Sequence, residues 1–255
     1  SLTASDGTDL LLQPTDELAF AGAHLYAYSY LYDKSCTLTD KDIKATFTVQ
    51  MPDKDDIYMN MWMKGQPQRT VFKALSPMTE GLSRTPGMPY NIKEQPTLTF
   101  VARQEGEAWN RPFVAIYEPS SAMEPGLIES VTFPEVTSNV EGSHVGICVK
   151  QKNGRTDYIL SSDTAAHVCS MGQMKTAATY ALWGKQGETD HIFFMGNGTY
   201  AETPRLTIKA DKNINVLLEN LDGEWYYTAS GPCRISLDGK QYVISRAVEV
   251  KTLLH

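Results

Sequence analysis

Histidine is the side chain best suited to proton transfer near neutral pH and to metal binding, and this chain has five, His24, His144, His167, His191 and His255. Two imidazoles that bind one metal ion often lie two residues apart on a strand or four apart on a helix, which places them on the same face. None of the five has a histidine partner at either spacing. We therefore expect no metal site and no cofactor on this chain, unless distant strands assemble one.

The four cysteines, Cys36, Cys148, Cys169 and Cys233, are widely spaced and form no Cys-x-x-Cys pair. Such spacing is not typical of a zinc knuckle or of a thioredoxin-like redox pair. We expect buried free thiols that pack as small hydrophobic side chains. One or two disulfides are the alternative.

Other catalytic signatures are absent from the sequence, which has no Gly-x-Ser-x-Gly elbow, phosphate-binding loop or dinucleotide fingerprint. Glu105 and Glu107 would share one face if the strand before them continued that far. A glycosidase does need two carboxylates about 5–10 Å apart, but any sheet offers such pairs by chance. We interpret both glutamates as structural.

The formal net charge is −7, and no run of Lys and Arg typical of nucleic-acid ligands occurs. An acidic polymer would therefore have to be bound by basic side chains gathered locally, against the overall negative field. No segment approaches the roughly 18 consecutive apolar residues of a membrane helix, so we expect no membrane span.

The elements that must position any site are short runs of period two, separated by Gly, Pro, Asn and Asp. This pattern predicts an all-β fold. We expect a large antiparallel β-sandwich of the supersandwich type over residues 1–200 and a smaller C-terminal β-sheet unit over residues 201–255. The predicted strands are Ile43–Gln50, Ile57–Lys64, Thr97–Arg103, Phe113–Glu118, Val145–Lys150, Asp157–Ser161, His191–Met195, Leu206–Lys209, Asn215–Glu219 and Gln241–Ser245.

Three Asn-Gly or Asp-Gly pairs lie between alternating runs, at Asn153-Gly154, Asp222-Gly223 and Asp238-Gly239. These residues supply the positive φ angles of a type I′ turn, so each pair predicts a hairpin. Asn197-Gly198-Thr199 matches a glycosylation sequon, but a plain turn after the strand that ends at Met195 is the favoured interpretation.

Two further segments have open interpretations. From Tyr58 to Lys64 the alternation places Tyr58, Asn60, Trp62 and Lys64 on one face and three methionines on the other. The methionine face is expected to be core, and the face of Trp62 is either a second buried layer or a platform for a ligand. From Ser76 to Gln95 the sequence predicts a long loop that contains Arg84 and Tyr90; it is either functional or a plain surface crossover.

One stretch is more specific, because residues 106–113 read Gly-Glu-Ala-Trp-Asn-Arg-Pro-Phe and residues 114–119 read Val-Ala-Ile-Tyr-Glu-Pro. This segment resembles the β-sandwich of heparinase II/III-like polysaccharide lyases. Met-Trp-Met-Lys-Gly at 61–65, Val-Gly-Ile at 145–147 and Arg-Thr-Asp-Tyr-Ile at 155–159 are similar to the same family, in the same order.

The resemblance implies an enzyme whose N-terminal helical toroid supplies the catalytic Tyr and His, and whose early sandwich adds another His and a structural zinc site. Those regions would lie before Ser1 or near it, so we expect no catalytic residue on this chain. Elimination from a uronate also needs a base, an acid and a group that neutralises the carboxylate, and the isolated histidines do not form such a set.

We therefore hypothesise that the chain is the non-catalytic, C-terminal β-sandwich portion of such a lyase and shapes one wall of an acidic-glycan cleft, of which glycosaminoglycans are one class. Aromatic rings cover the apolar faces of sugars, and Arg matches carboxylate or sulfate geometry. The candidate contacts are Trp62, Arg69, Arg84, Trp109 and Arg111. A carbohydrate-binding or cell-surface adhesion module that never belonged to an enzyme is the alternative, followed by a small hydrolase or lyase with its whole site on this chain.

The expected partners are an acidic polysaccharide or oligosaccharide and a missing helical toroid domain, with no nucleic acid. The expected location is the periplasm or the extracellular medium, after removal of a signal peptide.

Overall fold

The computed structural model describes residues 1–16, 31–51, 53–76, 96–107 and 109–255. Within these ranges every paired strand is antiparallel, and there is no helix that could cross a membrane. The predicted all-β class is confirmed. Arg84, Tyr90 and nearly all of the predicted Ser76–Gln95 loop lie outside the described residues.

The chain divides into two compact units. Unit 1 comprises Ser1–Ala108 with Phe113–Gly126, and unit 2 comprises Trp109–Pro112 with Leu127–His255. The boundary expected between residues 200 and 201 falls instead within a strand of unit 2, Thr189–Glu202.

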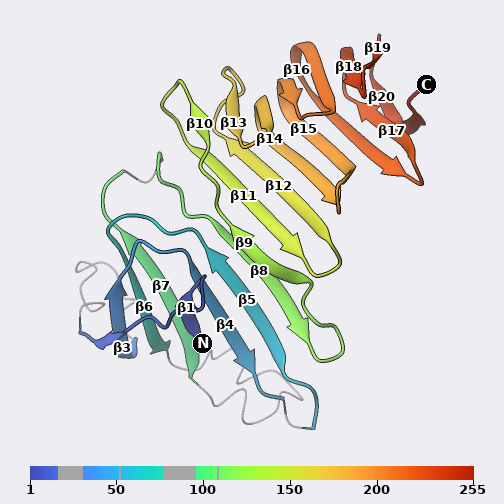
Figure 1. The fold of residues 1–255 in the computed structure, drawn as a ribbon. Coiled ribbons are helices and arrows are strands. Elements are labelled where there is room, and N and C mark those ends of the chain that lie inside the picture. Colours follow the sequence, from blue (N-terminus) through green and yellow to red (C-terminus); the bar gives the residue numbers. More distant parts are fainter. Residues whose placement is uncertain (17–30, 52, 77–95, 108) are drawn as a thin grey trace. The chain divides into compact units, whose positions relative to one another are not determined.

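Unit 1 contains two four-stranded sheets, with the strand orders β1-β4-β5-β8 and β2-β3-β6-β7 (Figure 1). The strands are β1 (Leu2–Ala4), β2 (Gln13–Pro14), β3 (Tyr32–Leu38), β4 (Ile43–Val49), β5 (Ile57–Met63), β6 (Arg69–Ser76), β7 (Thr97–Gln104) and β8 (Ala115–Ser121). Apolar side chains from both sheets meet between them, which makes this unit a β-sandwich.

The faces of β5 explain this packing. Met61 and Met63 are buried in the core together with Val71 of the other sheet, as expected for the methionine face. The third methionine, Met59, is 38% exposed, so the expectation was wrong for the first part of this strand. On the opposite face Trp62 is only 3% exposed, and the ammonium of Lys44 lies 5.1 Å from its ring centroid. Of the two interpretations of this face, a second buried layer or a platform for a ligand, the burial of Trp62 fits the first.

Unit 2 contains one twelve-stranded sheet with the main order β19-β18-β16-β15-β14-β12-β11-β9. In addition β10 pairs with β13, β13 with β14, β17 with β16 and β20 with β17 (Figure 1). The strands are β9 (Ile128–Thr132), β10 (Thr137–Ser138), β11 (His144–Gln151), β12 (Arg155–Ser162), β13 (Cys169–Met171), β14 (Met174–Gln186), β15 (Thr189–Glu202), β16 (Leu206–Leu221), β17 (Glu224–Ala229), β18 (Cys233–Leu237), β19 (Lys240–Ile244) and β20 (Val248–Leu253). Its core is formed by alternate side chains of these strands, including Phe193, Ile208 and Ile235.

All three predicted hairpins are present, with one difference in turn type. Asp222 and Gly223 have φ angles of 55° and 91°, and Asp238 and Gly239 have 51° and 80°, as type I′ turns require. At Asn153-Gly154 only the glycine has a positive φ, 85°, and its N–H donates to the Gln151 carbonyl, 3.0 Å away. This third connection is therefore a three-residue loop with glycine in the left-handed position.

The Asn197-Gly198 pair is not a turn. Strand β15 continues through it, and the pairing register shifts on both sides of Gly198, so the pair forms an irregular, bulged part of the strand. Asn197 has a φ of 51°, and its N–H donates to Oδ1 of Asn215, 2.8 Å away. In the same way the two strands predicted at Leu206–Lys209 and Asn215–Glu219 form one strand, β16, because the polar residues between them are exposed positions of a continuing strand.

Candidate functional site

The five candidate contacts lie in different environments. Trp109 is 57% exposed and Arg111 is half-buried, and both lie in the segment of residues 105–112, which follows β7 in the chain. Within this segment Trp109–Pro112 belongs to unit 2, whereas β7 and β8 belong to unit 1. Trp62 and Arg69 are buried, so neither presents its side chain to a ligand in this structure. Arg84 lies outside the described residues.

Arg69 contacts the residues that precede and follow this segment in the chain, both of them in unit 1. Its Nη2 donates to Oε1 of Gln104, the last residue of β7, over 2.5 Å. Its guanidinium carbon lies 4.8 Å from the ring centroid of Phe113, just after the segment. We call Arg69 with Gln104 and Phe113 the arginine clamp.

Main-chain groups complete the clamp. Nη1 of Arg69 donates to the carbonyl oxygen of Lys64, which follows β5. The N–H of Lys64 in turn donates to the carbonyl oxygen of Val114, 3.0 Å away. One side chain thereby links the ends of β5, β6 and β7 and the chain that leads into β8.

The charged guanidinium of Arg69 is hydrogen-bonded to neutral groups. Its side chain is 1% exposed, and burial lowers the pKa of the guanidinium from its ordinary value. That ordinary value is so high that the group stays protonated at neutral pH. Among the described residues no carboxylate forms an ion pair with Arg69, and its Nε has no hydrogen-bond partner.

A row of polar side chains crosses the sheet β4-β5-β8 on the same face as Trp62. Oγ1 of Thr46 donates to Oδ1 of Asn60 over 2.9 Å, and Nδ2 of Asn60 donates to Oγ of Ser120 over 3.4 Å. All three residues are half-buried. Hydroxyl and amide groups in such a row stabilise the sheet by cross-strand pairing.

Proton transfer by a tyrosine is disfavoured at the one phenol with a large shift among the described residues. The pKa of Tyr200 is raised to about 12, first by burial and then by the carboxylate of Glu202, to which its hydroxyl donates. A tyrosine that acts as a base at neutral pH needs a lowered pKa instead. Tyr200 therefore keeps its proton and stabilises the charge of Glu202, which also pairs with Lys175 at 3.1 Å.

The imidazole of His144 contacts polar groups of three neighbouring residues. Its Nδ1 lies 3.1 Å from Oγ of Ser162 and 3.5 Å from Sγ of Cys169, and its Nε2 lies 3.3 Å from the carbonyl oxygen of Val140. A cysteine nucleophile must be reached by its substrate, and Cys169 is 1% exposed. Within the described ranges no three His, Cys, Asp or Glu side chains are grouped to hold a metal ion, so these residues do not fit the structural zinc that the resemblance implies.

The sequence analysis did not predict the arginine clamp, although the sequence does indicate that Arg69 points inward. Arg69 and Val71 lie two apart on β6 and therefore share a face, and Val71 is fully buried in the core. The alternation thus indicated that Arg69 points inward. Its contacts with Gln104 and Phe113 depend on strand pairing and chain path, which no local pattern encodes.

Comparison with known proteins relates this chain to a polysaccharide lyase. The chain is 32% identical over 183 residues to an endo-acting ulvan lyase of Formosa agariphila. The match covers 70% of this chain and 21% of that protein, so the chain spans about a fifth of its relative. No family model matches the chain, and no solved structure matches it.

Proposed function

We propose that this chain is the non-catalytic β-sandwich portion of a heparinase II/III-like polysaccharide lyase, and that it shapes one wall of a cleft for an acidic glycan. The relation to an endo-acting ulvan lyase supports the enzyme class. The single structural observation that carries the wall is the exposure of Trp109, which is 57% exposed and lies two residues before Arg111 in the chain.

The chemistry of the segment suits a sugar acid. The indole of Trp109 covers the apolar face of a pyranose ring, and the fork of Arg111 matches a carboxylate or a sulfate. Glu105 and Glu107 lie in the same segment, and all four side chains already form other interactions. Ligand binding therefore exchanges existing contacts of Arg111 for contacts with the glycan.

In this proposal the candidate residues that the structure describes have two roles. Trp62 and Arg69 are buried and act through packing, whereas Trp109 and Arg111 touch the glycan.

The partners follow from the same proposal. The ligand is an acidic polysaccharide or oligosaccharide, and the groups that transfer protons belong to a helical toroid domain outside this sequence. A glycan of this kind is met outside the cytoplasm, so we place the protein in the periplasm or the extracellular medium.

The first experiment tests the non-catalytic role. The 255-residue chain is incubated with ulvan, heparin, heparan sulfate, chondroitin and alginate, and ultraviolet absorbance reports any unsaturated uronate. No absorbance increase is expected from the chain alone. Turnover of any of these polymers would show that a complete active site is present and would overturn the proposal.

The second experiment tests the wall by affinity electrophoresis in gels that contain one of the same polymers. Trp109→Ala and Arg111→Ala are expected to weaken retardation several-fold. The matched controls are Tyr117→Ala, which removes an aromatic side chain that is 59% exposed, and Arg234→Ala, which removes an exposed arginine of β18. Equal effects in controls and test variants, or binding of neutral glycans only, would refute the acidic-glycan wall; the latter result would favour an adhesion module.

A further inference from the structure

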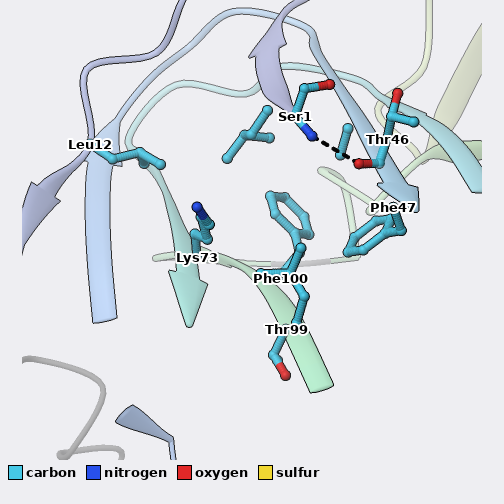
Figure 2. Close-up of a pocket in the computed structure, with 10 residues that line it drawn as sticks. Ser1, Leu12, Thr46, Phe47, Lys73, Thr99 and Phe100 are labelled. Carbon is cyan, nitrogen blue, oxygen red and sulfur yellow. Dashed lines mark hydrogen bonds between the residues drawn. The ribbon is translucent and has the colours of Figure 1, made fainter. Parts of the chain in front are cut away.

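A cavity of about 220 Å³ opens between the two sheets of unit 1. Its walls combine apolar side chains with the side-chain ammonium of Lys73, and Figure 2 shows Phe47, Phe100, Lys73 and Leu12 arranged around it. Phe47 comes from β4 of one sheet, whereas Lys73 and Phe100 come from β6 and β7 of the other. Beside the cavity the main-chain nitrogen of Ser1 donates to the Thr46 carbonyl oxygen over 2.9 Å and holds the start of the chain against β4.

Lys73 occupies an unusual position for a lysine. It lies two residues after the fully buried Val71 on the same strand, so it points to the same inner face of the sandwich. It is paired directly with Phe100, just as Val71 is paired with Ala102. The side chain is exposed, so the cavity that it lines is open to solvent.

Protection of a sheet edge does not explain this lysine. Natural proteins do place inward-pointing charges on edge strands to prevent aggregation. The strand order β2-β3-β6-β7, however, places Lys73 on an inner strand with neighbours on both sides.

Its charge is also uncompensated within the described part of the chain. No hydrogen bond or ion pair of its ammonium is present there, and neither Asp nor Glu lines the cavity. A cation beside two phenylalanine rings and leucine side chains is complementary to a ligand with one anionic group and an apolar body.

We propose that this cavity is a binding site for a small monocarboxylate whose body is one ring or a short chain. The carboxylate pairs with the ammonium of Lys73, and the body packs against Phe47, Phe100 and Leu98. The volume lies below the roughly 300–1,000 Å³ of sites for drug-sized ligands, so it suits one sugar ring or a comparable acid and excludes a polymer chain. The same chemistry is offered by a uronate at a glycan end and by a free aliphatic acid.

Neither Trp109 nor Arg111 lines this cavity, and the site does not depend on the proposed wall. It would give the chain a pocket for single acidic units in addition to a surface for the polymer. Loss of binding in one place leaves the other intact, so the two proposals fail independently.

The test measures binding of sodium glucuronate, sodium hexanoate and glucose to the full chain by ligand-observed saturation-transfer NMR, and by chemical shifts of the Phe47 and Phe100 amides. We expect one or both carboxylates to bind and glucose to bind at least about tenfold more weakly, because it lacks the charge. Lys73→Met should weaken carboxylate binding by about tenfold, and Lys73→Arg should retain most of it.

Lys212→Met is the matched control, since Lys212 is an exposed lysine of β16 in unit 2. Thermal unfolding of each variant shows whether it is folded. If Lys73→Met does not fold, Lys73→Arg still tests whether a cation at this position binds the carboxylate. Preference for glucuronate identifies a glycan end as the source, and preference for hexanoate identifies a free acid; either supports the site. Absence of carboxylate binding, equal binding of glucose, or no difference between Lys73→Met and Lys212→Met would overturn it.

Discussion

The guanidinium of Arg69 lies 4.8 Å from the ring of Phe113, so the first residue of β6 covers the chain just before β8. The same guanidinium donates to Gln104 at the end of β7. One buried arginine, 1% exposed, thus contacts both the last residue of β7 and a residue just before β8.

Loss of the clamp should destabilise unit 1. Arg69→Met removes the two hydrogen bonds that the Lys64 carbonyl and the Gln104 amide oxygen accept in a half-buried place, so we expect a loss of about 2–4 kcal/mol in the free energy of unfolding. Arg69→Lys should lose less, because the charge remains. Urea unfolding measures both, with Arg234→Ala as a surface control expected within about 0.5 kcal/mol of the parent. If Arg69→Met were as stable as this control, the clamp would contribute nothing to the free energy of unfolding.

Two glycines should respond differently to alanine. A Cβ at Gly198 would lie 2.4 Å from Cβ of Ala178 and 2.8 Å from the Ala177 carbonyl oxygen, so Gly198→Ala must displace β14 or β15. We expect a loss of about 1–3 kcal/mol from this overpacking. Gly223 has open space around it but a φ of 91°, so Gly223→Ala should cost about 1 kcal/mol through backbone strain alone. Thermal unfolding compares the stability of the two variants. A larger loss for Gly223→Ala than for Gly198→Ala would contradict the bulged geometry of β15.

The thiols should be protected in the native protein. All four cysteines lie within the described residues and are free, as expected from the sequence; Cys36 is half-buried and the other three are buried. Burial also raises the pKa of the Cys148 and Cys233 thiols, to about 11 for Cys233, which lowers the reactive thiolate fraction. We expect Ellman's reagent to modify Cys36 first under native conditions and all four thiols after denaturation. Denatured protein that titrates with fewer than four thiols would indicate a disulfide.

The Tyr200 hydroxyl should control the acidity of Glu202. The pKa of this carboxyl lies below its ordinary value, first because Tyr200 donates to it and then because of Lys175. A carboxyl with a depressed folded-state pKa adds stability above its unfolded-state pKa, and that stability is lost as the pH falls through the folded-state value. Tyr200→Phe should therefore raise the pKa of Glu202 and reduce the acid sensitivity of stability in this window. Carbon-13 NMR titration of the Glu202 carboxyl measures the shift, and Lys175→Met should produce a smaller one.

Much of the local structure could be predicted from the sequence. The ten strands predicted from alternation fall on nine of the twenty strands in the described residues, and Asn-Gly or Asp-Gly pairs located three hairpins, because side-chain period and positive φ are local properties. Long strands such as β14 were not predicted. The same rules failed at Asn197-Gly198, where pairing with two neighbouring strands keeps the chain extended through a typical turn pair.

The sequence by itself determined which side chains share a strand face; only the tertiary structure decided which of those faces another layer covers. Trp62 was correctly placed opposite the methionines, yet alternation did not decide whether it is buried, and Lys73 shares the face of a core valine yet opens into a cavity. The physical reason is that alternation follows from the geometry of a single strand, whereas burial is decided by contacts between segments distant in sequence.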